Sequence, residues 1–405
     1  MRILVLNQFF WPDTAPTGAL AADVVRALAA RGHRVTVLCA RNRYAQISSA
    51  AQAPPAEIVR VACPRYSRRA GGRLLSWTSF LLAAAWRSLR LPPPDVVLAM
   101  TTPPGLSRIG LLLKRRYGAR LWIWEMDLYP DVAAATGTLA PASRLYRAAD
   151  RILTAARRQA DGILALGECM KERLVAKGVD PARIVVAENW ADAEEIQPRP
   201  FPVLPPLKLL YSGNLGLAHD TETIFEAIRR LGGAAPIQFR FAGDGALRAA
   251  FEGRCRASGL GCVSFEPYCE RERLAASLAD CHIGLVTLRP ACAGTVVPSK
   301  LYPLLAAGRP VLFIGPEEST AARLIERHGC GWVVRPGRPD AAAALLCKLA
   351  AEPQRIFEAG ARGRRALEQH YDVRLGVARI VGALEAPSAA ACRPATARPV
   401  AAPIY

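Results

Sequence analysis

Short apolar runs alternate with amphipathic helical patterns along almost the whole chain. In the first half, the apolar runs predict strands at Ile3–Leu6, Val35–Leu38, Val96–Met100, Leu121–Trp124, Ile163–Leu166 and Ile184–Ala187. In the second half, they predict strands at Leu207–Tyr211, Phe239–Ala242, Val263–Phe265, Ile283–Leu288, Val311–Ile314 and Trp332–Val334. Between them, Leu20, Val24 and Leu28 share one face of a helix that Gly32 ends. Apolar strands between helices are typical of buried parallel sheets.

The pattern contains two α/β units, as expected for a chain of 405 residues, which is too long for one core. A proline-rich segment, Pro198–Leu207, separates them. We predict the α/β class, with two facing Rossmann-like domains that each hold a parallel sheet. The predicted parts are a first domain at 1–195, a linker at 196–206, a second domain at 207–370, a helix at 371–385 that packs back on the first domain, and a disordered Ala/Pro tail at 386–405.

Basic residues are concentrated in the first half of the chain. The net charge is +19, and residues 1–190 hold 27 Lys and Arg against 13 Asp and Glu. Arginines flank the apolar segment Leu74–Trp86, which as a helix reaches only ~20 Å, short of a ~30 Å hydrocarbon core. We therefore predict contact with an anionic membrane surface without a membrane span. The alternative is an ordinary core helix, because 47 of the 53 basic residues are Arg throughout the chain. No motif indicates a nucleic-acid partner.

The cysteines and the N-terminal segment indicate a cytosolic protein. The eleven cysteines are scattered, without a C-x-x-C pair or a His/Cys cluster at metal-ligand spacing, and we expect reduced thiols. The apolar run near the N-terminus is too short for a signal peptide, and we expect none.

Glycine-rich turns follow two of the second-half strands. The first contains Gly213, Asn214 and Gly216 and leads to Asp220, a good helix N-cap, and the second contains Gly243 and Asp244. Glycine lets the backbone approach an anion, and a helix N-terminus offers unpaired N–H groups to a phosphate. Each turn alone is weak evidence, because any strand–helix corner can use glycine.

A third corner, VPSKLY, adds a positive charge. Lys300 is one of three lysines after residue 190, and it follows Ser299, a candidate cap at a predicted helix start. A diphosphate beside these corners and one lysine would be neutralised without a metal. The alternative is that Lys300 is a solvated helix residue.

The ordered set of motifs resembles bacterial family-four glycosyltransferases, which have the GT-B fold. The segments YSGNLGLAHD, FAGDG and VPSKLYPLLAAGRPVLF carry the resemblance, together with ENWAD and DLYPD earlier in the chain. It extends over residues 2–385, and the branch that assembles exopolysaccharide, colanic acid and O-antigen is the most similar. The resemblance implies retaining transfer of a hexose-type sugar from a nucleotide diphosphate-sugar. The second domain would hold this donor and the first domain the acceptor, with no metal and no cofactor.

Carried over by position, the resemblance implies roles for individual residues. The donor diphosphate would contact Gly18, Gly213, Asn214, Gly216, Ser299 and Lys300. The nucleoside would lie beside Gly243, Asp244, Glu266 and Tyr268, and His219 is a further candidate donor contact or an ordinary loop histidine. Asp127 would be the catalytic carboxylate, which orients or deprotonates an acceptor hydroxyl or stabilises oxocarbenium charge. Its alternative role is a helix cap.

One departure from the family concerns ribose binding. Thr295 and Pro303 stand where the family has two glutamates eight positions apart, and neither can act as a carboxylate. We expect weaker or different ribose recognition, by Asp244 or by backbone groups. Pro303 also removes an N–H, so we expect its helix to start later or to kink.

The predicted function is sugar transfer to a lipid-linked saccharide, carried on polyprenyl diphosphate, at the cytoplasmic face of the inner membrane. A basic first domain suits such an acceptor because its diphosphate and the membrane are both anionic. Two alternatives remain open: an inactive binding or scaffold protein, and a nucleotide-sugar epimerase of the same fold. A dehydrogenase is disfavoured because no G-x-G-x-x-G follows a strand.

Overall fold

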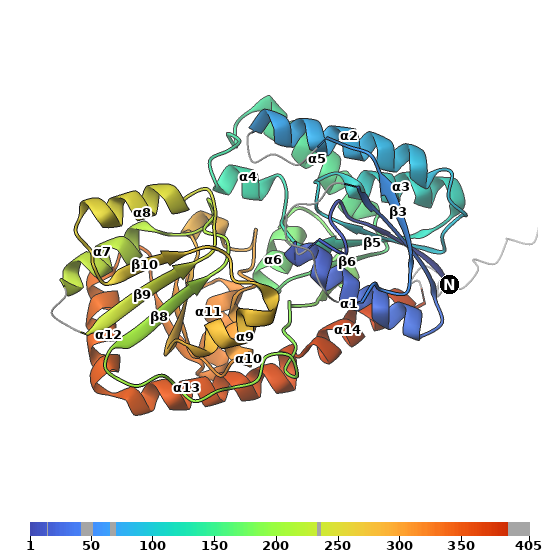
Figure 1. Ribbon diagram of the computed structural model, residues 1–405. Helices are drawn as coiled ribbons and strands as arrows, with labels where there is room; N and C mark the ends of the chain where they lie inside the picture. Colours follow the sequence, from blue (N-terminus) through green and yellow to red (C-terminus); the bar gives the residue numbers. More distant parts are fainter. Residues whose placement is uncertain (14, 42–51, 65–69, 233–235, 388–405) are drawn as a thin grey trace, which may run out of the picture.

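The computed structural model describes the chain except for residue 14 and residues 42–51, 65–69, 233–235 and 388–405. Within the described part, two α/β domains each contain one parallel sheet (Figure 1). Nearly all of the tail predicted to be disordered lies outside the described residues.

The first sheet has seven strands in the order β3-β2-β1-β4-β5-β6-β7. Their bounds are β1 (Arg2–Leu6), β2 (Arg34–Ala40), β3 (Glu57–Val61), β4 (Val96–Met100), β5 (Arg120–Glu125), β6 (Gly162–Ala165) and β7 (Ile184–Val186). Every strand predicted in this half is present. The sequence pattern does not predict β3, because this edge strand is mostly only half-buried and contains two charged residues in EIVRV.

Helices cover both faces of the first sheet. They are α1 (Pro16–Ala30), α2 (Ala70–Ser88), α3 (Leu106–Tyr117), α4 (Asp131–Ala135), α5 (Arg144–Gln159), α6 (Glu168–Ala176) and the 3₁₀ turn η1 (Pro181–Arg183). α2 packs against α3, and α3 against α5, whereas α1 packs against the C-terminal helix α14 (Val373–Glu385) (Figure 1). Gly32, at φ +80°, follows the last turn of α1 and ends it, as predicted.

The second sheet has six strands in the order β10-β9-β8-β11-β12-β13. They are β8 (Leu207–Ser212), β9 (Ile237–Ala242), β10 (Val263–Glu266), β11 (Ile283–Thr287), β12 (Val311–Ile314) and β13 (Gly331–Val334), and all were predicted. The helical elements are α7 (Glu222–Leu231), α8 (Arg248–Ala257), α9 (Arg271–Ala279), η2 (Pro290–Cys292), α10 (Leu301–Ala306), α11 (Thr320–His328), α12 (Pro339–Ala351) and α13 (Pro353–Ala366). The apolar side chains of β8 and β11 alternate between two cores, one on each face of this sheet.

Two isolated backbone bridges lie at the junction of the domains. Ala191, after β7, pairs with Asp372, where the chain leaves the π-helical turn η3 (Leu367–Tyr371) and enters α14. Through this connection the chain passes from α13 back to the first domain (Figure 1). The second bridge pairs Asp127, after β5, with Val296, before α10. The loop of Asp127 and the segment before Lys300, both predicted to belong to the active site, therefore meet between the two sheets.

Candidate active site

The ammonium group of Lys300 is held beside the carboxyl end of β8. Its Nζ donates to Tyr211 Oη at 2.5 Å and to the Asn214 carbonyl at 3.2 Å, and it lies 3.3 Å from His219 Nε2. The same nitrogen lies 4.1 Å from the centre of the Tyr211 ring, a cation–π contact. Tyr211 Oη donates in turn to the Asn214 carbonyl at 2.8 Å, which ties the lysine, the strand end and the glycine turn together.

Burial controls the charge of this cluster. His219 Nδ1 donates to the Thr287 carbonyl at 2.7 Å, so the neutral ring presents its unprotonated Nε2 to Lys300. Burial, followed by the charge of Lys300, lowers the pKa of His219 to about 3. Burial also lowers the pKa of Lys300 to about 7. An anion bound beside Lys300 would raise this pKa again, because it favours the charged ammonium.

Glycines allow the turns after β8 and β9 to touch. Gly213 and Gly243 have φ angles of +122° and +136°, which favour glycine. A Cβ atom on Gly243 would lie 2.1 Å from the Gly213 carbonyl oxygen, so a side chain there would displace the turn. The Cβ position of Gly213 faces the side chain of Lys300, with Cε at 3.5 Å. The missing side chain leaves the backbone beside the ammonium group accessible to a ligand.

The residues predicted to contact the nucleoside gather at the ends of β9 and β10. Gly243 and Asp244 follow β9, and Gly243 N donates to the Glu266 carbonyl at 3.1 Å. Tyr268 lies two residues beyond β10 and is exposed. A small pocket adjoins this edge, lined by Tyr211, Gly213, Leu215, Phe241, Ala242, Gly243, Asp244, Arg248 and Phe265. The candidate diphosphate and nucleoside contacts are thus neighbours.

Asp127 lies on the first-domain side of the junction. Its backbone pairs with Val296, four residues before Lys300, and the adjacent Leu128 N donates to the Thr295 carbonyl at 2.8 Å. Burial, followed by the charge of Glu125, raises the pKa of Asp127 to about 6. A carboxyl group with this pKa can exchange a proton near neutral pH. Asp127 does not cap a helix, since α4 begins at Asp131 without a side-chain cap.

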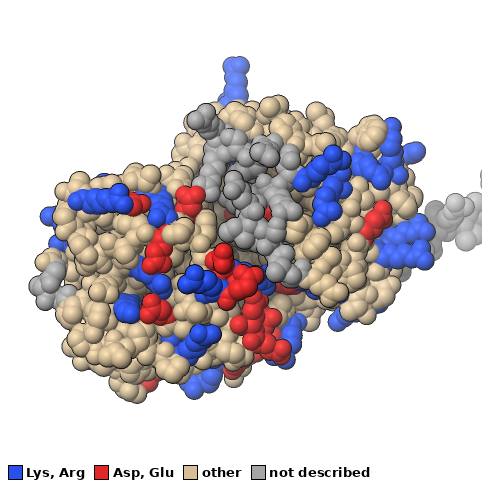
Figure 2. All heavy atoms as spheres, in the orientation of Figure 1, with Lys and Arg blue, Asp and Glu red and all other residues tan. Residues whose placement is uncertain are grey.

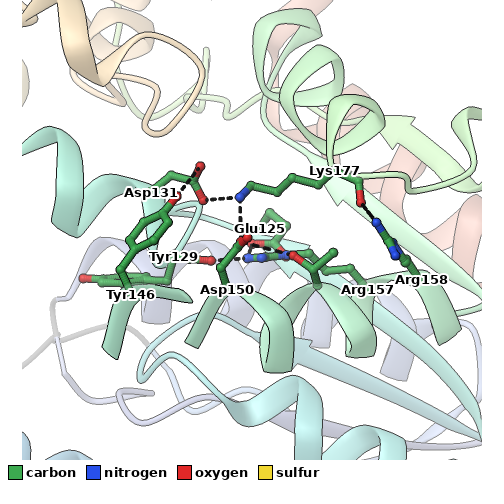
Figure 3. Close-up of polar contacts among 9 residues, drawn as sticks. Glu125, Tyr129, Asp131, Tyr146, Asp150, Arg157, Arg158 and Lys177 are labelled. Carbon is green, nitrogen blue, oxygen red and sulfur yellow. Dashed lines mark hydrogen bonds and ion pairs between the residues drawn. The ribbon is translucent and has the colours of Figure 1, made fainter. Parts of the chain in front are cut away.

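Figure 3 shows polar contacts of residues that precede and follow Asp127 in the chain, among them Glu125, Tyr129 and Asp131. Arg157 of α5 forms a buried ion pair with Glu125, with Nε 2.7 Å from Oε1, and its Nη2 donates to the Tyr129 carbonyl at 2.8 Å. Lys177 lies 3.0 Å from Asp131 Oδ2 at the far end of the loop. Both ends of the segment that carries Asp127 are therefore attached to side chains of the first domain.

Comparisons with known proteins agree with this geometry. Residues 17–190 match the family described as the glycosyl transferase 4-like domain. The chain is 28% identical over 395 residues to the probable glycosyltransferase WbjE of Pseudomonas aeruginosa, covering 91% of this chain and 94% of that protein. It is 27% identical over 407 residues to the putative colanic acid biosynthesis glycosyl transferase WcaI of Escherichia coli strain K12, covering 92% and 98%.

The fold is also similar to that of solved structures. WaaG, a glycosyltransferase involved in lipopolysaccharide biosynthesis, matches with a TM-score of 0.65 at 17% identity, covering 94% of this chain and 98% of that chain. The crystal structure of Anabaena Alr3699/HepE in complex with UDP matches with a TM-score of 0.69 at 13% identity, covering 95% of this chain and 99% of that chain. The chain is a glycosyltransferase of the GT-B fold.

Two capping predictions for this glycosyltransferase have different outcomes. Asp220 lies one residue before the N-cap, Thr221, yet its Oδ1 accepts a hydrogen bond from Thr223 N at 3.0 Å and so bonds the first turn of α7. The prediction that Ser299 caps α10 is wrong. Lys300 occupies the N-cap position without a side-chain cap, and Ser299 is exposed one residue earlier. In the described part of the chain, the Ser299 hydroxyl forms no hydrogen bond with the first turn of α10.

The positions that replace the family's glutamates serve the backbone in this glycosyltransferase. Thr295 is fully buried, and its Oγ1 donates to the Cys292 carbonyl at 2.9 Å. Pro303 is the third residue of α10, where the missing N–H has no intrahelical partner to lose. α10 therefore begins at Leu301, and the expected later start is wrong.

Gly18 lies in the first turn of α1. A Cβ atom there would lie 3.1 Å from the Phe9 carbonyl oxygen, so the small residue permits close packing of α1 on the loop after β1. Its predicted contact with the donor remains a prediction, as do those of Gly216, Asp244 and Tyr268.

Sequence reasoning missed two side chains that organise the site of this glycosyltransferase. Tyr211 contacts Lys300, and its signal is a tyrosine near the end of a mostly apolar strand, directly before the glycine turn. Arg157 lies on the buried face of α5 beside Thr154 and Ala156. An arginine at an inward-facing helical position is a recognisable signal for a buried ion pair, because such a charge needs a partner.

Proposed function

We propose that this glycosyltransferase moves a hexose-type sugar from a nucleotide diphosphate-sugar to a saccharide on polyprenyl diphosphate, with retention of anomeric configuration. The transfer would serve synthesis of a bacterial surface polysaccharide. The relative WcaI is described as a putative colanic acid biosynthesis glycosyl transferase, and HepE was crystallised with UDP. Retention and the lipid carrier rest on the motif resemblance and on the basic first domain.

The observation that carries the proposal is that Lys300 and Asp127 belong to segments of different domains that meet through a backbone bridge. Lys300 provides an ammonium group beside two glycine turns, which suits a donor diphosphate. Asp127 belongs to the other domain, yet its backbone pairs with the segment that precedes Lys300. A carboxylate at that place can orient an acceptor hydroxyl, accept its proton or stabilise an oxocarbenium-like transition state.

A transfer assay with purified protein tests the proposal. We expect one sugar from a panel of UDP- and GDP-sugars to move to a polyprenyl-diphosphate-linked saccharide, with the product linkage in NMR keeping the donor's anomeric configuration. Inversion would contradict retention. Conversion of the nucleotide-sugar to its epimer without acceptor would support an epimerase, and binding without turnover would support a scaffold protein.

The acceptor's lipid requires access to a membrane, and α2 has a suitable surface. Phe80 and Ala84 face the core, whereas Leu82 and Trp86 point outward with 73% and 59% of their surface exposed. The guanidinium of Arg90 lies 3.8 Å from the Trp86 ring centre. Figure 2 shows mainly basic side chains over the first domain in this view. Among the described residues, no helix is long and apolar enough to cross a membrane. We propose peripheral binding through α2 at the cytoplasmic face of the inner membrane.

Changing the outward face of α2 should release the protein from vesicles. With Leu82→Gln and Trp86→Gln together, we expect affinity for vesicles rich in phosphatidylglycerol to fall tenfold or more, since a buried large apolar side chain contributes ~1.5–3 kcal/mol. Vesicle co-sedimentation measures this. Val203→Gln is the matched control, because Val203 is 84% exposed and lies outside α2. Equal vesicle binding by the double variant and wild type would exclude α2 as the contact.

A further inference from the structure

A cavity in the first domain lies apart from the Lys300 cluster and has no role in the site described so far. Its volume is about 290 Å³, close to the lower end for ligand pockets. It opens at the carboxyl ends of β2 and β3, next to the loop after β1. The described residues that line it are Phe10, Trp11, Pro12, Asp13, Ala40, Arg41 and Arg60.

Two arginines give this cavity the character of an anion site. Arg41 and Arg60 are exposed, and the guanidinium of Arg41 makes no hydrogen bond to any residue in the described part of the chain. Arg60 uses Nη2 to donate to the Trp11 carbonyl at 2.9 Å, and its remaining N–H groups make no hydrogen bond to another described residue. Guanidinium groups bind phosphate oxygens in a two-pronged geometry.

The remaining lining residues are compatible with an anion. The Asp13 carboxylate is buried and accepts a hydrogen bond from Ala15 N at 3.0 Å, so part of its charge is satisfied within the protein. Phe10, Trp11 and Pro12 supply apolar surface against which a sugar ring or a prenyl chain can pack. The cavity therefore combines two guanidinium groups with an apolar wall.

Hydrogen bonds connect this cavity with Asp127 across the carboxyl ends of the strands. Ala40 N donates to the Gln8 carbonyl at 2.9 Å, and Gln8 N donates to the Thr102 carbonyl at 2.8 Å. The adjacent Thr101 Oγ1 accepts from Asp127 N at 3.2 Å. The path crosses from β2 to β5, three interstrand spacings or roughly 14 Å. A short saccharide can span such a distance.

The cavity also adjoins the helix proposed to contact the membrane. Gln8 Nε2 donates to Ser76 Oγ of α2 at 3.0 Å, and α2 packs against β2 and β3, whose ends form the cavity. A lipid headgroup that leaves the bilayer at α2 would therefore reach the arginines before it reaches Asp127.

We propose that Arg41 and Arg60 bind the diphosphate of the lipid-linked acceptor, so that its saccharide extends across the carboxyl ends of the strands toward Asp127. This inference rests on the proposed function, because it assigns the acceptor's charged group to a place in the first domain. It predicts two separate diphosphate sites in one chain, one at Lys300 for the donor and one at Arg41 and Arg60 for the acceptor.

Calorimetric titration with inorganic pyrophosphate tests the two sites separately. We expect two equivalents to bind to the wild type, one to Lys300→Met and one to Arg41→Gln/Arg60→Gln. The control Arg2→Gln/Arg34→Gln removes the same charge from exposed positions at the other ends of β1 and β2, and it should still bind two. In Lys300→Met, farnesyl diphosphate should displace the remaining pyrophosphate, whereas glucuronate should not.

The possible results distinguish this inference from the donor proposal. Two equivalents bound by Arg41→Gln/Arg60→Gln, or none bound by Lys300→Met, would overturn the acceptor site, and displacement by glucuronate would assign it to an acidic sugar instead. Two equivalents in Lys300→Met would overturn the donor site alone. In transfer assays, we expect the arginine variant to raise KM for the diphosphate-linked acceptor by tenfold or more for each arginine removed. The KM of a neutral glycoside acceptor should not change.

Discussion

Replacing Lys300 with methionine should lower the rate of sugar transfer by about 10²- to 10³-fold, as does loss of one preorganised charge-stabilising group in other enzymes. Methionine keeps the length and the apolar stem but removes the ammonium group that Tyr211 and the Asn214 carbonyl hold in place. The affinity for the nucleotide-sugar should fall by tenfold or more, because hydrogen bonds to charged groups contribute ~1.5–3 kcal/mol. Steady-state kinetics and calorimetry measure the two effects.

The pH dependence of donor binding provides a second test of the same residue. In the protein without bound donor, the pKa of Lys300 is about 7, so its ammonium form disappears as the pH rises above 7. A bound diphosphate raises this pKa, so binding should take up a proton, and the dissociation constant should increase about tenfold per pH unit above 7. Calorimetry in buffers of different ionisation enthalpy measures the uptake. The ligand should be a nucleotide-sugar and not a free nucleoside diphosphate, because the terminal phosphate of the latter itself titrates near pH 6.

Lys208→Met is the matched control for both measurements. Lys208 lies on β8, the strand of Tyr211, but its ammonium group pairs with Asp280 at 3.0 Å, away from the glycine turns. It should change neither donor affinity nor proton uptake. If Lys300→Met binds the donor within threefold of wild type, the diphosphate does not rest on this lysine.

Asp127→Asn should lower kcat by about 10²- to 10⁴-fold, the usual contribution of a positioned acid or base. The asparagine keeps the shape of the side chain and leaves the backbone bridge to Val296 in place. With a pKa of about 6, Asp127 should give the wild-type pH–rate profile an acid limb near pH 6, and the variant should lack it. A variant with more than a tenth of wild-type kcat and an unchanged acid limb would remove Asp127 from the chemistry.

The same substitution should stabilise the fold at neutral pH. The folded-state pKa of Asp127 lies above its ordinary value of 3.8, so the folded protein favours the protonated acid. The favourable contribution is complete below pH 3.8 and is lost as the pH rises through about 6. Asp127→Asn should therefore raise the free energy of unfolding by ~1–3 kcal/mol above pH 6, with a difference that vanishes toward pH 4. Denaturant unfolding measures this. Asp340→Asn is the control, since Asp340 is 83% exposed and its ion pair with Arg230 should contribute less than ~1 kcal/mol.

The sequence predicts most of the framework of this protein, because apolar strands and glycine turns are local signals. Gly213 and Gly243 are recognisable as glycines in turns after strands and Lys300 as a lysine at a predicted helix start, and the structure brings them to one place. The partners of Lys300 were less accessible, since the contact with Tyr211 joins residues 89 positions apart. The distance between Lys300 and Tyr211 depends on the path of the loop before α10, and no local sequence pattern determines that path.

The errors and omissions have similar physical causes. Ser299 was misplaced by one residue because N-cap geometry depends on where the helix actually begins. β3 was missed because an edge strand buries little and alternates poorly. Arg41 and Arg60 were not singled out, since an arginine-rich chain hides two functional arginines among many. Only the meeting of two strand ends separates them from the rest.

The two backbone bridges at the domain junction restrict how one domain can move relative to the other. Asp127 pairs with Val296, and Ala191 pairs with Asp372. Further contacts accompany these bridges, since Leu128 N donates to the Thr295 carbonyl at 2.8 Å and Arg323 lies 2.8 Å from Glu172. Separating the domains at the Asp127 loop has to break such contacts. The surroundings of this carboxylate are therefore complete only while the two domains are together.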